Sequence, residues 1–217
     1  MIWVAEIGSA HGGDRSLAFE LIRQAKMAGA TIAKFQLGWT EEAQMRYAGN
    51  INPVRNIDDW AGQLKEWCDH FDIEFMASVW DEPGVEIVKS LGLKRVKLAS
   101  QVFFDDSEET MQLVMAVDEL GIETFQSGDN IWVVPEYPVY PSSFYTKNFG
   151  DGTWFGYSSH MHGIADALIA VARGAKYIEK HVTLNKADSS LRDNSFALDF
   201  GEFKQMVQIG NEIARLV

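Results

Sequence analysis

AKMAGATIAKFQ, residues 25–36, contains the pattern that decides the fold, and the pattern recurs as VKSLGLKRVKLAS (88–100), AVDELGIETFQS (116–127) and AVARGAKYIEKH (170–181). In each stretch an amphipathic helical segment ends at a glycine, and a β-rich run begins within about four residues, the length of a helix-to-strand loop. The glycines expected to end these helices in the left-handed conformation are Gly29, Gly92, Gly121 and Gly174. Helices and strands that alternate in this way predict a parallel sheet.

Four further β-rich runs raise the number of expected strands to eight. They are WVAEIG (3–8), IEFMASVW (73–80), IWVVPEY (131–137) and TWFGYSSH (153–160). A chain of 217 residues with eight strands, and without a GxGxxG turn or a P-loop, favours a closed (β/α)8 TIM barrel over an open doubly wound sheet. We therefore predict a single α/β barrel domain that spans residues 1–217.

The fifth and sixth runs do not fit this pattern. Only Asp129 and Asn130 separate ETFQSG from IWVVPE, whereas parallel neighbours need a crossover of about a dozen residues. The helix between strands 5 and 6 is therefore expected to be missing, and either the two runs form an irregular hairpin or one of them is not a barrel strand. Residues 136–155, rich in proline, glycine and aromatic residues, are expected to form a long loop of the kind that often covers a functional site.

The charge and the hydropathy pattern exclude several classes of partner. The formal charge of −12 disfavours binding to nucleic acid or to an anionic membrane, so any anionic substrate requires a local cationic pocket. No run of about 18 apolar residues occurs, and the start MIWVAEIGSAHGGD lacks the features of a signal peptide. The sequence therefore predicts a soluble, cytoplasmic protein without nucleic-acid or membrane partners.

Polar residues end all eight expected strands. In reading order they are Glu6, Lys34, Gln36, Ser78, Lys97, Ser100, Gln126, Ser127, Glu136, Ser158, His160, Lys180 and His181. One polar residue at a strand end is uninformative, since solvent is near, but the chemistry of such barrels lies at the carboxyl ends of the strands. Eight polar ends that converge on one face therefore predict a functional site there.

At the level of motifs the chain resembles the sialic acid (N-acetylneuraminate) synthase family. The motifs are AEIGSAHGG (5–13), AKFQ (33–36), VKLAS (96–100), GYSSH (156–160), IEKHVT (178–183) and RDNSFALD (192–199). The resemblance implies a TIM-barrel enzyme that condenses phosphoenolpyruvate with a 2-acetamido sugar aldehyde similar to N-acetylmannosamine. The implied products are a nine-carbon 2-keto-3-deoxy sugar acid and phosphate. The implied cofactor is a divalent metal, namely manganese, with magnesium or cobalt as alternatives.

The resemblance also implies roles for individual residues. His160 and His181 end neighbouring strands and match the metal ligands of the family, and imidazole nitrogen suits manganese or a similar transition metal. Positions that bind the substrates are matched by Lys34, Ser78, Lys97, Ser100, Ser127, Tyr137 and Ser158. A catalytic role at the reacting centre is implied for Glu6, Lys34, Gln36 and Asp193.

The residues alone leave other interpretations open. Each histidine, taken without the resemblance, is more simply a hydrogen-bonded structural histidine. Asp193 is equally compatible with a loop-capping aspartate, and a packing role is at least as good an interpretation of His11. Lys34 and Lys97 follow apolar residues in runs flanked by helices, where a charge is costly unless it is paired or used, and this favours anion binding.

Departures from the family pattern weaken the inference about the sugar acceptor more than the inference about the type of reaction. Ser159 replaces an aspartate, Gln101 replaces a glycine, and the chain ends at EIARLV without the small C-terminal antifreeze-like domain that lends an arginine to the sugar site. The resemblance implies a homodimer as the oligomeric state. Two alternatives remain open, a metal-dependent pyruvate aldolase on the same barrel and a non-catalytic barrel that binds a sugar phosphate.

Overall fold

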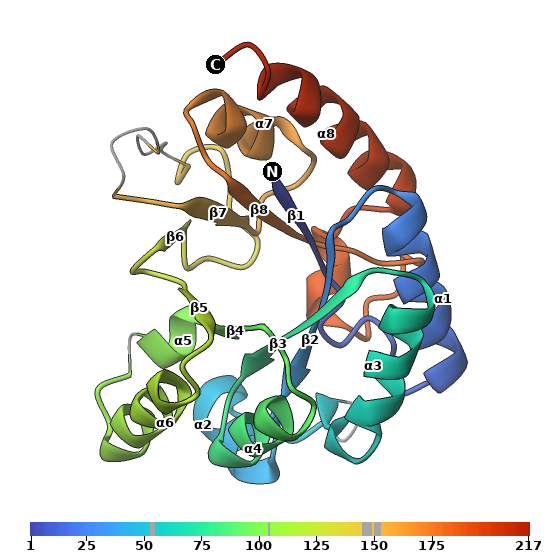
Figure 1. Cartoon of the computed structure of the whole chain (residues 1–217). Helices are drawn as coiled ribbons and strands as arrows, with labels where there is room; N and C mark the ends of the chain where they lie inside the picture. The colour runs from blue at the N-terminus through green and yellow to red at the C-terminus, as the bar shows by residue number, and fades with distance from the viewer. Residues whose placement is uncertain (53–54, 104, 145–148, 150–152) are drawn as a thin grey trace.

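The computed structural model, which describes residues 1–52, 55–103, 105–144, 149 and 153–217, is a nearly closed barrel of eight parallel strands (Figure 1). The strands are β1 (Ile2–Glu6), β2 (Ile32–Leu37), β3 (Glu74–Val79), β4 (Arg95–Leu98), β5 (Glu123–Gln126), β6 (Ile131–Val133), β7 (Gly156–Ser159) and β8 (Tyr177–His181). Their order in the sheet is β5-β4-β3-β2-β1-β8-β7-β6. The predicted barrel and all eight predicted strands are confirmed.

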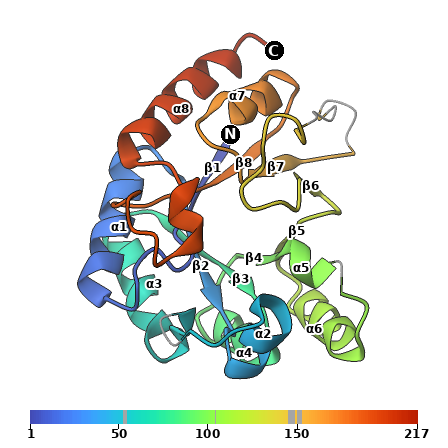
Figure 2. The ribbon, with the colours of Figure 1, turned by 180° about the vertical axis from the view of Figure 1, so that it is seen from behind.

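Helices cover most of the outside of this sheet, as the two opposite views in Figures 1 and 2 show. The longer ones are α1 (Arg15–Met27), α3 (Ala61–His70), α4 (Glu82–Ser90), α6 (Glu108–Glu119), α7 (Ala165–Ala172) and α8 (Phe200–Ile213). Shorter elements lie in the loops, namely α2 (Glu41–Ala48), η2 (Asp58–Trp60), α5 (Ser100–Phe103) and η3 (Arg192–Ser195). The four glycines predicted to end helices all have positive φ, between 58° at Gly92 and 94° at Gly174.

The helix between β5 and β6 is absent, as predicted, but both predicted consequences are wrong. The two runs do not form a hairpin and both belong to the sheet, because β5 pairs in parallel with β4 and β6 in parallel with β7. An isolated parallel bridge joins Ser127, directly after β5, to Ile131, the first residue of β6. The start of β6 thus lies beside the end of β5, which fits the stagger of strands in a barrel, and a four-residue turn is enough to connect them.

The Asn130 side chain closes the seam at this turn. Its Oδ1 accepts a hydrogen bond from the backbone N–H of Gln126 at 2.8 Å, and its Nδ2 donates to the carbonyl oxygen of Thr124 at 3.0 Å. The amide therefore bonds to the edge of β5 in the way that a neighbouring strand would. The carbonyl oxygen of Asn130 accepts from Phe155 N at 2.8 Å, so this one residue connects β5 to the start of β7.

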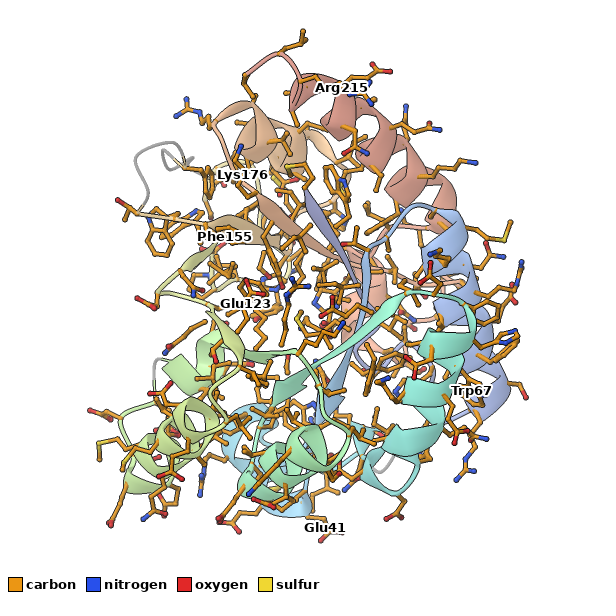
Figure 3. The ribbon with its side chains drawn as sticks, in the orientation of Figure 1. Glu41, Trp67, Glu123, Phe155, Lys176 and Arg215 are labelled. Carbon is orange, nitrogen blue, oxygen red and sulfur yellow. The ribbon has the colours of Figure 1, made fainter. Side chains whose placement is uncertain are left out.

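Among the described residues no helix follows β5 or β6, and Glu123 and Phe155 lie along this uncovered side (Figure 3). The long loop predicted over residues 136–155 falls partly outside the described residues, at 145–148 and 150–152. Its first part is held to β7, because Val139 N donates to the carbonyl oxygen of His160 at 3.0 Å. No helix of the described chain is long and apolar enough to cross a membrane.

The barrel interior is divided into an apolar and a polar layer. Side chains near the amino ends of the strands form an apolar cluster of Val4, Ile32, Met76, Phe125, Ile131 and Tyr177. Below it, at the first residues of three strands, Arg95 forms ion pairs with Glu74 and Glu123. Since strand side chains alternate between faces, the next inward residues toward the carboxyl ends are Glu6, Lys34, Ser78, Ser127, Val133 and Glu179, all of them polar except Val133.

Candidate active site

One cavity opens at the carboxyl ends of the strands and has a volume of about 830 Å³, including its solvent-open mouth. All twelve residues that the sequence assigned to a site line it: Glu6, Lys34, Gln36, Ser78, Lys97, Ser100, Ser127, Tyr137, Ser158, His160, His181 and Asp193. They come from six strands, β1, β2, β3, β4, β7 and β8, and from the segments that follow strands. The structure thus brings together every predicted site residue in one place.

A cluster of alternating charges forms the floor of the cavity. The Lys34 ammonium forms an ion pair with Glu6, donates to Ser78 Oγ at 2.6 Å and lies 3.6 Å from Glu179 Oε1. Lys97 donates to the same Glu179 oxygen at 2.5 Å and to Ser158 Oγ at 3.2 Å. Two lysines therefore project into one buried space, with hydroxyl donors beside each of them.

Burial acts differently on the pKa values of these four groups. Burial, which outweighs the attraction of Lys34, raises the pKa of Glu6 to about 7, and burial lowers the pKa of Lys97 to about 8. For Lys34 and Glu179 the opposite charges around them outweigh burial, so the pKa of Lys34 is raised and that of Glu179 is lowered. Near neutral pH the cluster therefore contains two ammonium groups and one firmly ionised carboxylate, with Glu6 in its titration range.

Two imidazoles stand above this floor. The ring centroids of His160 and His181 are 5.6 Å apart, and the Phe196 ring lies edge-on to both. Burial lowers the pKa of His181 to about 4 and lowers that of His160 well below its ordinary value. Both rings are therefore neutral at pH 7 and have a nitrogen lone pair to offer.

The surroundings of the imidazoles fit a metal ion in part. His160 Nδ1 lies 3.4 Å from the carbonyl oxygen of Val134, and His181 Nδ1 lies 3.9 Å from Asp193 Oδ2. The contact of His160 is of the kind that orients the Nδ1–H of a metal-binding histidine and leaves Nε2 free to coordinate, whereas the contact of His181 is longer than a hydrogen bond. Within the described parts of the chain, however, no group of three or more histidine, cysteine, aspartate or glutamate side chains is placed to hold a metal. The two imidazoles are therefore the candidate nitrogen ligands that this part of the site presents.

The upper wall of the cavity carries polar groups with defined partners. Gln36 Oε1 accepts from Trp39 Nε1 at 2.6 Å, and the hydroxyls of Tyr137 and Ser100 lie 3.2 Å apart. The Tyr137 ring also packs on His160 with a centroid distance of 4.0 Å. A fixed amide and a fixed aromatic ring suit the recognition of a small polar molecule.

Glu179 is the main site residue that reading strand ends did not identify. It precedes His181 by two residues and therefore points to the same face of β8, whereas Lys180 points outward and donates to Ser159 Oγ at 2.8 Å. Strict alternation back from His181 would have found it. Gln126 and Glu136, also counted among the strand ends, do not line the cavity. His11 does not line it either, because its Nδ1 accepts from Gly13 N and orders the loop after β1.

Comparisons with known proteins agree with this architecture. The model of the NeuB family matches residues 21–109 and 143–217. Human N-acetylneuraminate-9-phosphate synthase is 29% identical over an alignment that covers 94% of this chain and 68% of the human protein. N,N'-diacetyllegionaminic acid synthase from Legionella pneumophila is 27% identical, with 94% of this chain and 70% of that protein covered.

Among solved structures, an N-acetylneuraminic acid synthetase from Leptospira borgpetersenii has a similar fold. It superimposes with a TM-score of 0.76 at 23% identity and covers 99% of this chain and 84% of its own. A truncated 3-deoxy-D-arabino-heptulosonate 7-phosphate synthase from Thermotoga maritima gives a TM-score of 0.64 at 14% identity. At these identities the likeness is one of fold.

Proposed function

Because the chain belongs to the NeuB family, we propose that it condenses phosphoenolpyruvate with the aldehyde group of a 2-acetamido sugar similar to N-acetylmannosamine. The chain is an enzyme of a family whose relatives named above are sugar acid synthases. The proposed products are a nine-carbon 2-keto-3-deoxy sugar acid and inorganic phosphate. The observation that carries the proposal is the arrangement of two buried lysines and two neutral imidazoles in one cavity.

The floor of the cavity is the proposed site for phosphoenolpyruvate. The substrate carries a carboxylate and a phosphate, and a protein of formal charge −12 needs localised cations to hold both groups. Lys34 with Ser78 and Lys97 with Ser158 provide two such positions, each with an ammonium next to a hydroxyl. Ser100 and Ser127 add hydroxyl donors at the ends of β4 and β5.

The upper part of the cavity is the proposed site for the sugar aldehyde. Gln36 and Tyr137 present a fixed amide and a fixed aromatic ring to this space, and the buried Oε1 of Glu6 has no hydrogen-bond partner among the described residues. An unpartnered carboxylate oxygen at this position is suited to accept a hydrogen bond from a sugar hydroxyl. Asp193, beside His181, is the proposed group that moves a proton at the reacting end.

The proposed reaction forms one carbon–carbon bond and breaks one bond between carbon and the phosphate oxygen. The methylene carbon of phosphoenolpyruvate forms a bond to the aldehyde carbon, and the aldehyde oxygen takes up a proton. Water then adds to the carbon that bears the phosphate, the bond between that carbon and the phosphate oxygen breaks, and a keto group forms. A divalent metal held by His160 and His181 would act as a Lewis acid for the aldehyde, and manganese is the proposed ion. The two lysines hold the anionic donor in line with the aldehyde, which is the main contribution of the protein.

Phosphate release tests the proposal. The protein is incubated with phosphoenolpyruvate, manganese and a panel of 2-acetamido and simple sugar aldehydes, and phosphate is measured with and without chelator. We expect one phosphate per molecule of sugar acid and a large loss of rate in Lys97→Gln, with the exposed-lysine variant Lys204→Gln as matched control. Sugar acid formed from pyruvate without phosphate release would indicate an aldolase, and no product with any acceptor would reject the proposal.

Metal affinity tests the histidine assignment separately. We expect His181→Ala and His160→Ala to weaken manganese binding at least tenfold in calorimetry, because each removes one of two nitrogen ligands. His162→Ala is the matched control, since His162 is an exposed histidine two residues after His160. Unchanged manganese affinity in both site variants would remove the assignment.

A further inference from the structure

Glu179 stands at the centre of the lysine cluster, and both of its carboxylate oxygens are occupied. Oε1 accepts from Lys97 at 2.5 Å and from Ser158 at 2.9 Å, and it lies 3.6 Å from Lys34 Nζ. Oε2 accepts a hydrogen bond from the hydroxyl of Tyr177. One carboxylate on β8 thus joins a lysine on β2, two strands away in the sheet, to a lysine on β4, four strands away.

Lys97 depends on this carboxylate for its charge. Lys97 is 3% exposed, and the charged or titratable groups that act on it are Glu179, Lys34, Glu6, His160 and His181. Glu179 is the only carboxylate among the described residues that contacts Lys97 directly, because Glu6 is paired with Lys34. With Glu179 in place, burial already lowers the pKa of Lys97 to about 8. Without it, the pKa of Lys97 would fall further.

Two effects of opposite sign therefore compete when Glu179 loses its charge. A carboxylate beside an anion site repels the anion, so simple Coulomb reasoning predicts tighter binding when the carboxylate is neutralised. The same change removes the group that keeps Lys97 charged and holds both ammonium groups toward one space. The loss of a cation that donates to the ligand outweighs the relief of repulsion, since charge-assisted hydrogen bonds are the stronger interaction in a buried site.

We propose that Glu179 is a positioning residue, which holds the ammonium groups of Lys34 and Lys97 together at one dianionic ligand of the phosphoenolpyruvate type. The proposal rests on the proposed function for the identity of that ligand. The contacts of Glu179 with Lys34 and Lys97 do not depend on the identity of that ligand.

Binding of phosphoenolpyruvate by the full chain, followed by calorimetry at pH 6.5 and pH 8, tests the proposal. We expect Glu179→Gln, which keeps the shape of the side chain, to weaken binding about tenfold to a hundredfold at pH 8 and much less at pH 6.5, where Lys97 regains its proton. Lys97→Gln should bind weakly at both pH values. Glu123→Gln, at the opposite end of the barrel, is the matched control and should bind as the unaltered protein does.

A milder variant separates positioning from loss of folding. Tyr177→Phe removes the hydroxyl that fixes Glu179 Oε2 but leaves the carboxylate in place, so we expect a loss of a few-fold in affinity in a protein that still unfolds cooperatively. Equal or tighter binding by Glu179→Gln at pH 8 would overturn the proposal.

The titration of Lys97 gives a readout that needs no substrate. In protein labelled with ¹⁵N-lysine, the Nζ resonance that disappears in Lys97→Gln is followed against pH. We expect its midpoint to fall in Glu179→Gln, and an unmoved midpoint would also overturn the proposal. If the unaltered protein does not bind phosphoenolpyruvate, the proposed function fails, while the titration still decides the role of Glu179.

Discussion

Glu6 places a carboxyl group in the barrel interior, where it is 1% exposed, and burial raises its pKa from 4.5 to about 7. Between pH 4.5 and pH 7 the folded protein holds a proton that the unfolded chain has already lost. The stabilisation from this proton is therefore fully present below pH 4.5 and is lost as the pH rises through 7. For one proton, the free energy of unfolding can change by at most about 1.4 kcal/mol per pH unit.

Glu6→Gln should remove this dependence. We expect the free energy of unfolding in urea to fall less steeply between pH 5 and pH 7.5 in the variant than in the unaltered protein, because the glutamine does not titrate. The exposed variant Glu86→Gln on α4 should keep the original slope. Equal slopes in all three proteins would show that Glu6 does not titrate in this range.

At the scale of single residues, the sequence identified the inward side chains at strand ends but not those one layer below. His181 and Lys97 were visible as polar ends of apolar runs, whereas Glu179 appeared as one of two charged residues inside IEKH. Assigning it required the direction of each side chain, which follows only when one inward residue of the strand is known. The partners of each charge depend on distances across the barrel, and a single sequence does not contain them.

Two helical glycines show how packing decides the effect of one substitution in an element. A Cβ added at Gly210 of α8 would lie 2.3 Å from Cη2 of Trp3, whereas at Gly62 of α3 the nearest atom is 4.0 Å away. Alanine in place of glycine favours a helix by roughly 1 kcal/mol, but overpacking costs about 1–3 kcal/mol. Trp3 is also held by its hydrogen bond to Asn211 at 3.0 Å, so it has little freedom to move.

We therefore expect opposite results from the same substitution. Gly210→Ala should destabilise the protein by about 1–2 kcal/mol and lower the thermal midpoint by several degrees, while Gly62→Ala should stabilise it by up to about 1 kcal/mol. Urea unfolding of both variants, with near-ultraviolet circular dichroism to report on Trp3, measures the difference. A stabilised Gly210→Ala variant would mean that α8 shifts outward at little cost.

The helices and strands themselves were largely predictable, because α1, α4, α6 and α7 are each followed by a glycine and each strand is a short apolar run. The connection from β5 to β6 was not, because the rule that parallel strands need a long crossover ignores the stagger of a closed barrel. The bridge between Ser127 and Ile131 belongs to the closed sheet and not to either strand alone. Local sequence patterns therefore predict the helices and strands. The short turn between β5 and β6 is explained only by the closed barrel.

At the scale of the whole molecule, the barrel is held differently on its two sides. Six longer helices pack around most of the sheet, but among the described residues none follows β5 or β6 (Figure 1). The uncovered side relies on the turn at residues 127–130, where the Asn130 amide bonds to both Gln126 and Thr124. We expect this seam to be the place where the closed barrel opens first, since only the isolated bridge between Ser127 and Ile131 pairs β5 with β6 among the described residues.

Asn130→Ala tests this expectation, because it leaves the N–H of Gln126 and the carbonyl of Thr124 without their partner. We expect a loss of about 1–3 kcal/mol in the free energy of unfolding and faster hydrogen exchange that is confined to β5 and β6. The stability of Asn130→Asp should fall between that of the unaltered protein and that of Asn130→Ala, since a carboxylate accepts from Gln126 but cannot donate to Thr124. The control Asn185→Ala removes a hydrogen bond to Ala187 N in an exposed turn and should change stability by less than about 0.5 kcal/mol. Exchange that accelerates equally in all strands would show that the barrel opens as one unit and not at this seam.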